Sequence, residues 1–374
     1  MSVPFLDLHR QHEAVGDVVE ARVAEVVDRQ AFVLGEAVEA FERALAGHEG
    51  VGHAVGVASG SDALELGLRA LDVGEGDEVV TSPFTFFATS GAIHHAGARP
   101  VFADIEPDTF NLDPEAAEAA VGPDTAALLP VHLFGQMADM EAIGEVADRH
   151  GLAVLEDAAQ SVGASRTTSD GPTVPGRSGD AAAVSFYPAK NLGGWGDGGA
   201  VLTDDDGVAG RVRRLRVHGG RKMYHHVEVG RNSRLDALQA AVLHAKLGHL
   251  ADWNAARAEH AAWYQERFEP LEAAGHLRRP AVEPGAEHVW HQYTLRVEDR
   301  DDLRSHLEGR EIGTGVYYPV PLHLQPCFED LGYGEGDFPR AERAARQVIS
   351  LPVFPELTPG EREEVADALE DFYR

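Results

Sequence analysis

Short apolar runs alternate with amphipathic stretches along the first two thirds of the chain. The run at 54–58 is typical of a buried strand, and the leucines after it, Leu64, Leu68 and Leu71, recur at helical spacing. We therefore expect a helix that opens at Asp62. The same reasoning predicts strands at 78–81, 100–104, 126–131, 152–155, 182–186 and 200–203, and helices at 88–96, 114–121 and 140–150.

This βαβα order predicts an α/β fold with a mostly parallel sheet covered by helices on both faces. Residues 167–178, rich in Ser, Thr, Gly and Pro, are expected to form a surface loop. From Leu235 to about Leu271 the pattern is that of one long helix. Beyond it we expect strands at 293–297 and 315–318, and helices at 301–308, 339–349 and 360–373. We predict a large domain over 1–250 and a smaller α/β domain over 251–374, with which the N-terminal segment can pack.

Composition narrows the class of protein. Of 374 residues, 44% are hydrophobic, and no apolar run approaches the ~20 residues that span a bilayer. The net charge of −30 repels nucleic acid and anionic membranes, so neither is an expected partner. The dispersed acidic residues and the scarcity of lysine resemble proteins of salt-adapted organisms. Cys327 is the only cysteine, which excludes an intrachain disulfide and favours a cytoplasmic location.

The scarcity of lysine draws attention to Lys190. The other lysines, Lys222 and Lys246, lie in a polar stretch and on the predicted long helix, whereas Lys190 stands just before the glycine-rich segment 193–199. Arginine can replace lysine in ion pairs, but its guanidinium stays protonated and cannot act as an amine nucleophile. A Schiff base needs a primary amine that can lose its proton in a desolvated pocket. Lys190 is therefore a candidate nucleophile, and a solvated loop lysine is the alternative.

Polar residues at predicted strand ends point to one cleft. Ser61, Asp157 and Lys190 each follow such an end, and ligands of parallel sheets bind beyond the carboxyl ends of strands. Gly60, Ser61 and Asp62 would present free N–H groups at a helix N-terminus to an anion; an ordinary N-cap is the alternative. Asp157 could hold the protonated nitrogen of a pyridine ring, or simply cap the next helix.

Weaker signals accompany this set. One ring among Phe84, Phe86 and Phe87 could stack on a planar cofactor, although aromatic clusters are more often core. The Ser185 hydroxyl could bind a phosphate. The glycines of 193–199 lack the order of a dinucleotide fingerprint and are expected to let the backbone pass close to a cofactor. The histidines show no metal-ligand spacing, so no metal is expected.

Taken in order, these residues resemble the DegT/DnrJ/EryC1/StrS family of sugar aminotransferases, which are pyridoxal phosphate enzymes of fold type I. The resemblance runs from Phe5-Leu6-Asp7-Leu8 to Leu351-Pro352, nearly the whole chain. Its specific stretches are Ser59-Gly60-Ser61-Asp62-Ala63-Leu64, Glu156-Asp157-Ala158-Ala159-Gln160-Ser161, Ser185–Gly199, and Asn232-Ser233-Arg234-Leu235-Asp236 with Gln239-Ala240-Ala241.

The resemblance implies a role for each position. Lys190 would form a Schiff base with pyridoxal 5'-phosphate and later move a proton, and Asp157 would pair with the pyridinium nitrogen. Gln160 would touch the ring hydroxyl and Phe86 would stack on the ring. The phosphate would be held by Gly60, Ser61, Asp62 and Ser185, and by Asn232 from the partner subunit of a homodimer; the candidates for contacting the sugar nucleotide are Arg234, Tyr317 and Tyr318.

The activity implied by the resemblance is transfer of an amino group from an amino acid, L-glutamate by family analogy, to a keto-sugar nucleotide. One alternative is a pyridoxal phosphate-dependent sugar dehydratase, but some such relatives carry His where this chain has Lys190. The other is a regulatory or sensor protein without turnover. Lys190, Asp157 and Gln160 together disfavour it, because a protein that only binds needs no amine paired with an electron-sink partner.

The charge of the chain predicts a salt effect on substrate capture. The field of 30 net negative charges repels an anionic nucleotide sugar at low salt, and 1 M salt shortens the Debye length to about 3 Å. We expect initial-rate assays to give a KM for the nucleotide sugar that falls as KCl is raised. A KM that rises steadily with salt would contradict this expectation.

Overall fold

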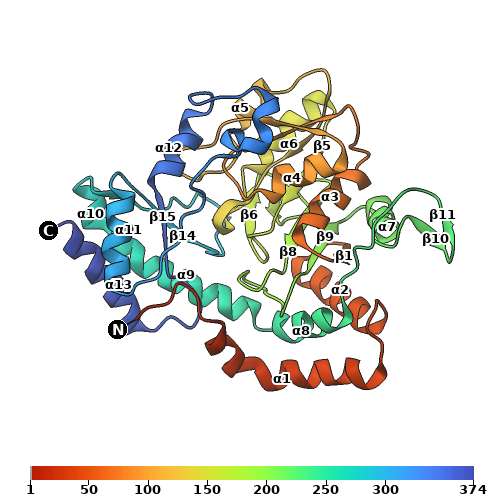
Figure 1. Ribbon diagram of the computed structural model, residues 1–374, viewed down its shortest axis with the longest axis horizontal. Coiled ribbons are helices and arrows are strands. Elements are labelled where there is room, and N and C mark those ends of the chain that lie inside the picture. Colours follow the sequence, from red (N-terminus) through yellow and green to blue (C-terminus); the bar gives the residue numbers. More distant parts are fainter. Residues whose placement is uncertain (1) are drawn as a thin grey trace.

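The computed structural model describes residues 2–374, and a seven-stranded sheet lies at its centre (Figure 1). The order of its strands is β1-β9-β8-β5-β4-β2-β3. Their bounds are His53–Val57 for β1, Glu78–Thr81 for β2, Arg99–Phe102 for β3, Thr125–Leu129 for β4, Ala153–Asp157 for β5, Ala181–Ser185 for β8 and Gly199–Thr203 for β9. Strand β9 runs antiparallel to both neighbours, and the other pairs are parallel. The predicted α/β class is confirmed, and the predicted strands agree with these bounds to within two residues.

Both faces of the sheet are buried, which explains why its strands read as continuous apolar runs. Val79, Leu129 and Leu155 point to one face, where they pack against helices α3, α4 and α7. Their sequence neighbours, such as Val80 and Val154, point to the opposite face, which helices α2, α5, α6 and α8 cover. The helices of the first two thirds are α1 Leu8–Arg29, α2 Glu36–Glu49, α3 Gly60–Ala70, α4 Ala88–Ala96, α5 Pro114–Ala119, α6 Met140–His150, α7 Asp206–Leu215 and α8 Ala237–Leu247.

A second group of elements follows the sheet. Its strands are β12 Leu277–Arg278, β14 Tyr293–Val297 and β15 Val348–Leu351, which form a three-stranded sheet. Its helices are α9 Leu250–Arg267, α10 Glu269–Ala273, α11 Arg300–Gly309, α12 Pro339–Gln347 and α13 Pro359–Phe372. Leu250 belongs to the apolar cluster of the central sheet and Ala261 to the second cluster. On this ground we propose the division into 1–250 and 251–374.

The N-terminal segment lies beside the second group and not beside the first. Val3 pairs in parallel with Ile312, and its backbone exchanges hydrogen bonds of 3.0 and 2.8 Å with Glu311 and Gly313. The polypeptide then crosses to the sheet through α1, whose residues pack on α8. Val3 near the N-terminus and helix α13 near the C-terminus therefore pack into the same apolar cluster, that of the second group of elements.

Several predicted elements were wrong. The long helix breaks between α8 and α9 at Gly248, a residue of low helix propensity, and α9 then runs toward the second group (Figure 1). The strand expected at 315–318 is reduced to one bridge between Gly315 and Ser350, and residues 348–351 form β15 where a helix end was expected. Helices α1 and α2 were not predicted.

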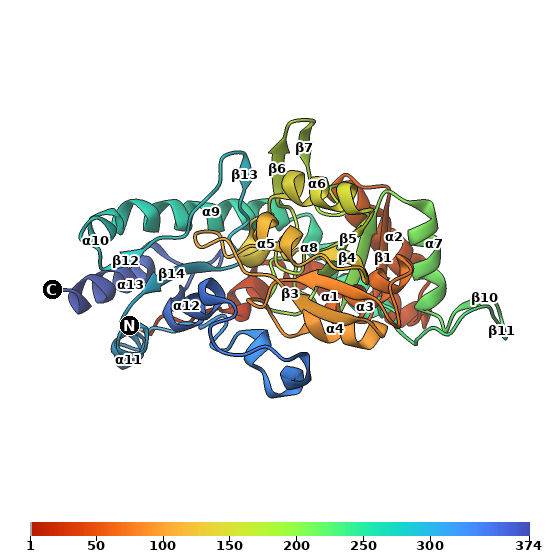
Figure 2. The same cartoon turned by 90° about the horizontal axis from the view of Figure 1, so that it is seen from above.

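Two hairpins depart from the layered body. The expected loop at 167–178 contains strands β6, Ser165–Thr168, and β7, Gly171–Thr173, with β13, Ala286–Glu287, paired to β6. Strands β10, Gly220–Lys222, and β11, His225–His226, form a hairpin that projects from the end of the molecule (Figure 2). No helix of the described chain is long and apolar enough to cross a membrane.

One ion pair joins the first helix to the last. Arg10 binds the Glu361 carboxylate through both terminal nitrogens, at 2.6 and 2.8 Å. Glu361 also completes a capping box with Thr358 at the start of α13. The hydrogen bonds from Arg10 and Thr358 lower the pKa of Glu361 to about 2, although burial opposes the change.

This depressed pKa predicts a stability that depends on pH. The contribution is complete above the unfolded-state pKa of 4.5 and is lost as the pH falls toward about 2. We expect Glu361→Gln to lower the free energy of unfolding by up to ~3 kcal/mol at pH 7 and by much less at pH 3, measured by urea denaturation. Glu363→Gln, at an exposed position of the same helix, is the matched control. An equal loss at both pH values would count against this role for Glu361.

Candidate functional site

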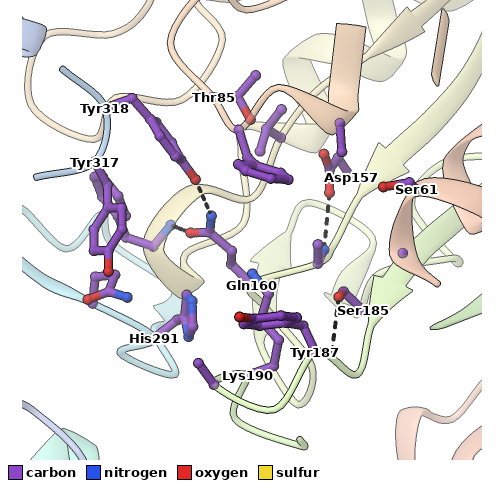
Figure 3. A pocket seen from close by; sticks show the side chains of 18 of the residues that line it. Ser61, Thr85, Asp157, Gln160, Ser185, Tyr187, Lys190, His291, Tyr317 and Tyr318 are labelled. Atoms are coloured by element: carbon purple, nitrogen blue, oxygen red, sulfur yellow. Dashed lines mark hydrogen bonds between the residues drawn. The ribbon is translucent and has the colours of Figure 1, made fainter. Parts of the chain in front are cut away.

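A cavity of about 550 Å³ opens at the carboxyl ends of strands β5 and β8 (Figure 3). It is lined from the sheet, from the start of α3, from the second group of elements and from the N-terminal segment. Nine of the predicted site residues line it, namely Gly60, Ser61, Phe86, Asp157, Gln160, Ser185, Lys190, Tyr317 and Tyr318. The remaining predicted residues, Asp62, Asn232 and Arg234, do not.

Lys190 lies in a turn directly after β8, held by a 2.8 Å hydrogen bond from its backbone N–H to the Tyr187 carbonyl. Burial lowers the pKa of its amine to about 8, and the Asp157 charge opposes this change. Its Nζ has no hydrogen-bond partner among residues 2–374. A substantial fraction of the amine is therefore neutral near physiological pH, as a nucleophile or general base requires.

Asp157, the last residue of β5, is 5% exposed. One carboxylate oxygen accepts a 2.7 Å hydrogen bond from the Thr89 hydroxyl, which lies 3.1 Å from that of Thr85. The other accepts from the backbone N–H of Ala159 at 3.2 Å. Burial raises the pKa of Asp157, while these two bonds and the Lys190 charge favour the ionised form. A cationic group in the cavity would stabilise this carboxylate.

The N-terminus of α3 forms a candidate anion cradle beside β8. The backbone N–H groups of Gly60 and Ser61 have no partner in the described chain and lie at the positive end of the helix dipole. The Ser185 hydroxyl oxygen accepts from the N–H of Tyr187 at 3.3 Å, which leaves its proton to donate. A Cβ at Gly60 would lie 2.6 Å from that of Ser185, so only glycine allows this close approach.

Asp62 plays a different part from the one expected. The helix begins at Gly60 and not at Asp62, because Ser59 is the N-cap and its hydroxyl accepts from the Asp62 N–H at 3.1 Å. The Asp62 carboxylate accepts from the Ser233 hydroxyl at 2.9 Å. Both polar groups of Asp62 are therefore occupied, and the free N–H groups are those of Gly60 and Ser61.

Gln160 is oriented by its neighbours. Its Oε1 accepts from the backbone N–H of Phe134 at 2.7 Å, and its Nε2 donates to the Tyr318 hydroxyl at 3.0 Å (Figure 3). Phe86 lines the cavity and is 58% exposed, whereas Phe87 packs on Phe328 with ring centroids 5.6 Å apart. Of the two rings, only Phe86 is available to a ligand in this cavity.

Asn232 and Arg234 do not line the cavity. Asn232 is exposed and forms a β-bridge with Val217, and Arg234 is half-buried.

The sequence analysis missed several residues of this site. His291 and Arg257 line the cavity although they lie far from the predicted motifs, and Thr89 holds Asp157 from behind. Phe5 and Leu6 also line it. No local pattern marks His291 and Arg257, because each reaches the cavity from an element remote in sequence from the predicted motifs, whereas Phe5, Leu6 and Thr89 lie in or near stretches already singled out.

The hydrogen bonds of His291 determine which of its ring nitrogens carries the proton. The Asn191 amide nitrogen donates to Asn254 and to the Val289 carbonyl, both at 2.8 Å, so its Oδ1 must accept from His291 Nδ1 at 3.1 Å. Burial and the charge of Lys190 hold the pKa of His291 well below its usual value. The ring is therefore neutral, and its Nε2 is an acceptor.

The donor set fits pyridoxal phosphate. Lys190 offers an amine for the aldehyde, Asp157 a carboxylate for the ring nitrogen, and Gly60, Ser61 and Ser185 donors for the phosphate. The described chain holds no group of three or more His, Cys, Asp or Glu side chains that could bind a metal ion.

Comparison with known proteins gives an independent result. Residues 15–370 match the DegT/DnrJ/EryC1/StrS aminotransferase family. The chain is 49% identical over 375 residues to a pleiotropic regulatory protein of Geobacillus stearothermophilus, covering 100% of this chain and 99% of the relative. It is 46% identical over 373 residues to dTDP-3-amino-3,4,6-trideoxy-alpha-D-glucose transaminase of Streptomyces venezuelae, covering 99% and 96%.

Solved structures agree with these matches. DesV of S. venezuelae, in complex with a ketimine intermediate, superposes with a TM-score of 0.95 at 46% identity, covering 99% of this chain and 98% of that one. NtdA of Bacillus subtilis, with the cofactor PMP bound, gives a TM-score of 0.92 at 33% identity, covering 99% and 85%.

The close approach at Gly60 predicts a selective loss of cofactor binding. We expect Gly60→Ala to push the start of α3 away from Ser185 and to weaken pyridoxal phosphate binding by at least about tenfold, measured by absorbance titration. Gly47→Ala, in α2 where nothing lies within 4 Å of the added methyl, is the control. Equal affinity of the Gly60→Ala and control proteins would argue against the cradle.

Proposed function

Because the chain belongs to the DegT/DnrJ/EryC1/StrS aminotransferase family, we propose that it transfers an amino group from an amino acid to a keto-sugar nucleotide. The observation that carries the proposal is the pairing of Lys190 and Asp157 in one cavity. A half-buried amine whose pKa burial lowers to about 8 faces a buried carboxylate there, and both lie beyond the ends of parallel strands.

Pyridoxal phosphate, when bound, supplies an aldehyde that condenses with amines and a protonated ring that withdraws electrons. Lys190 would hold the cofactor in the resting protein. Its amine, once free, would serve as the base for the proton on the carbon that bears the donor's amino group. A base with a pKa of about 8 is matched to this task near neutral pH.

Asp157 keeps positive charge on the ring nitrogen. Thr89 and the Ala159 N–H hold the carboxylate in place and favour its ionised form. Gly60 and Ser61 would hold the phosphate through the free N–H groups at the start of α3, together with the Ser185 hydroxyl. Gln160, whose Nε2 donates one hydrogen to Tyr318, would have its second for the ring hydroxyl. The local cradle offsets the repulsion that a chain of net charge −30 exerts on a phosphate.

The substrate class follows from the names of the relatives. Those named as transaminases of dTDP- and UDP-linked sugars include proteins 46% and 42% identical to this chain. We propose a keto-sugar nucleotide as amino acceptor and L-glutamate as donor. Tyr317 and Tyr318, on the wall formed by the second group of elements, are the proposed contacts of the sugar.

We propose that the protein acts as a homodimer, in the cytoplasm. On and beside the projecting hairpin, Met223, Tyr224 and Val229 are 84%, 92% and 83% exposed, which favours a contact with a second copy. Asn232 and Arg234 follow this hairpin and do not line the cavity of their own chain. They would complete the cavity of the partner, Asn232 at the phosphate and Arg234 at the sugar nucleotide.

A regulatory role is the rival candidate, because one relative bears the name of a regulatory protein. A protein that only binds has no use for a reactive amine set beside an electron-sink carboxylate. A dehydratase on the same fold would consume no amino donor. Formation of 2-oxoglutarate from L-glutamate in the presence of a keto-sugar nucleotide therefore separates the transaminase from both alternatives.

Lys190 provides the direct test. We expect the protein loaded with pyridoxal phosphate to be yellow, and borohydride to attach the cofactor to the peptide that contains Lys190, as read by mass spectrometry. The peptides with Lys222 and Lys246 serve as internal controls. In Lys190→Arg we expect no attachment and a transamination rate at least about 10²-fold lower. A wild-type protein that stays colourless after cofactor addition and carries no label after borohydride treatment would contradict the proposal.

A further inference from the structure

Four arginine side chains are buried in the part of the chain that the structure describes. Arg166, Arg216 and Arg362 each lie within 4.0 Å of a carboxylate oxygen. Arg257, 5% exposed, has no carboxylate within that distance, although the chain contains 62 acidic residues. An unpaired buried charge is costly, so this exception calls for a physical explanation.

The guanidinium of Arg257 is only partly satisfied. Its Nη1 donates to the backbone carbonyls of Trp290 and Val353 at 3.3 and 3.4 Å. Its Nε is buried without a partner, and its Nη2 has no hydrogen-bond partner among residues 2–374. The side chain lines the same cavity as Lys190. The carbonyls therefore fix the plane of the guanidinium and leave Nη2 to donate to a ligand, whereas the surrounding protein closes off Nε.

The surroundings of Arg257 favour an anion in this part of the cavity. Burial lowers the pKa of Arg257 to about 10, with only the charge of Glu356 acting against it, so the group is cationic but poorly compensated. His291, which the charges of both Lys190 and Arg257 influence, is neutral and presents an acceptor nitrogen. A carboxylate placed here would thus be bound by Arg257 and not by His291.

We propose that Arg257 binds a carboxylate of the amino donor, and of the 2-oxo acid that the donor becomes. The inference rests on the proposed transamination. The donor is the substrate whose carboxylates must come close to Lys190, whereas the charge of a nucleotide sugar lies on its diphosphate, away from the reacting carbon. Arginine suits this role because its guanidinium stays charged when buried and its free Nη2 carries two N–H donors for a carboxylate.

Binding of glutarate, a dicarboxylate that has no amine to react, tests the contact directly. Isothermal titration of the holoenzyme should show that Arg257→Gln weakens glutarate binding about ten- to hundredfold. Glutamine is too short to reach the two carbonyls, so thermal melting with cofactor absorbance verifies that the variant is folded and loaded. Arg304→Gln, at an exposed position of α11, is the matched control. Unchanged glutarate binding in Arg257→Gln would overturn the proposal.

Steady-state kinetics locate the effect within the reaction. We expect Arg257→Gln to raise the KM for L-glutamate at least tenfold and to leave the KM for the nucleotide sugar within twofold. Arg257→Lys, which keeps the charge without the guanidinium, should fall between. An equal rise in both KM values would overturn the proposal and point to the diphosphate as the ligand.

L-Glutamine as donor identifies which carboxylate is bound. If Arg257 holds the side-chain carboxylate, the preference for glutamate over glutamine disappears in Arg257→Gln; if it holds the α-carboxylate, both donors weaken equally. The experiments also distinguish a failure of the proposed transamination from a failure of the inference about Arg257. Glutarate binding that depends on Arg257 without any transamination would refute the proposed function alone, and transamination with unchanged donor KM in the variant would refute this inference alone.

Discussion

The close approach of the start of α3 to the ends of strands β8 and β9 is the constraint on which the site depends. A side chain at Gly60 would collide with Ser185, and one at Gly199 would lie 2.4 Å from the Ser59 carbonyl oxygen. Without side chains at these two positions, the free N–H groups of the helix stand beside the strand that leads to Lys190. The candidate anion cradle and the proposed nucleophile are thereby held on one rigid unit.

The charged residues that line the cavity do not share the strongly negative balance of the whole chain. The chain carries a large excess of carboxylates, yet the cavity wall holds two cations, Lys190 and Arg257, against two carboxylates, Asp157 and Asp197. Burial lowers the pKa of each cation and raises that of Asp157, so these three groups are more sensitive to a ligand than surface groups would be. Local burial, and not net charge, sets the chemistry of this site.

The positions of the strands and most residues of the site could be predicted because their signals are local. Apolar runs buried on both faces mark the strands, and Lys190, Asp157 and Ser61 follow strand ends that parallel topology brings to one edge. The break at Gly248 could not be predicted from periodicity, since the leucines on both sides continue the pattern. Strand β15 was missed because its pairing partner, β14, lies more than fifty residues earlier.

The sequence by itself determined the fold class and the family and predicted Lys190 as nucleophile with Asp157 as its acidic partner, because each depends on residue type and on spacing along the chain. Only the tertiary structure decided that Asp62 is occupied by Ser59 and Ser233, that Thr89 holds Asp157, and that Arg257 is buried without a carboxylate. These facts depend on contacts between elements far apart in sequence. Burial and hydrogen-bond satisfaction are properties of the packed chain, and no local pattern encodes them.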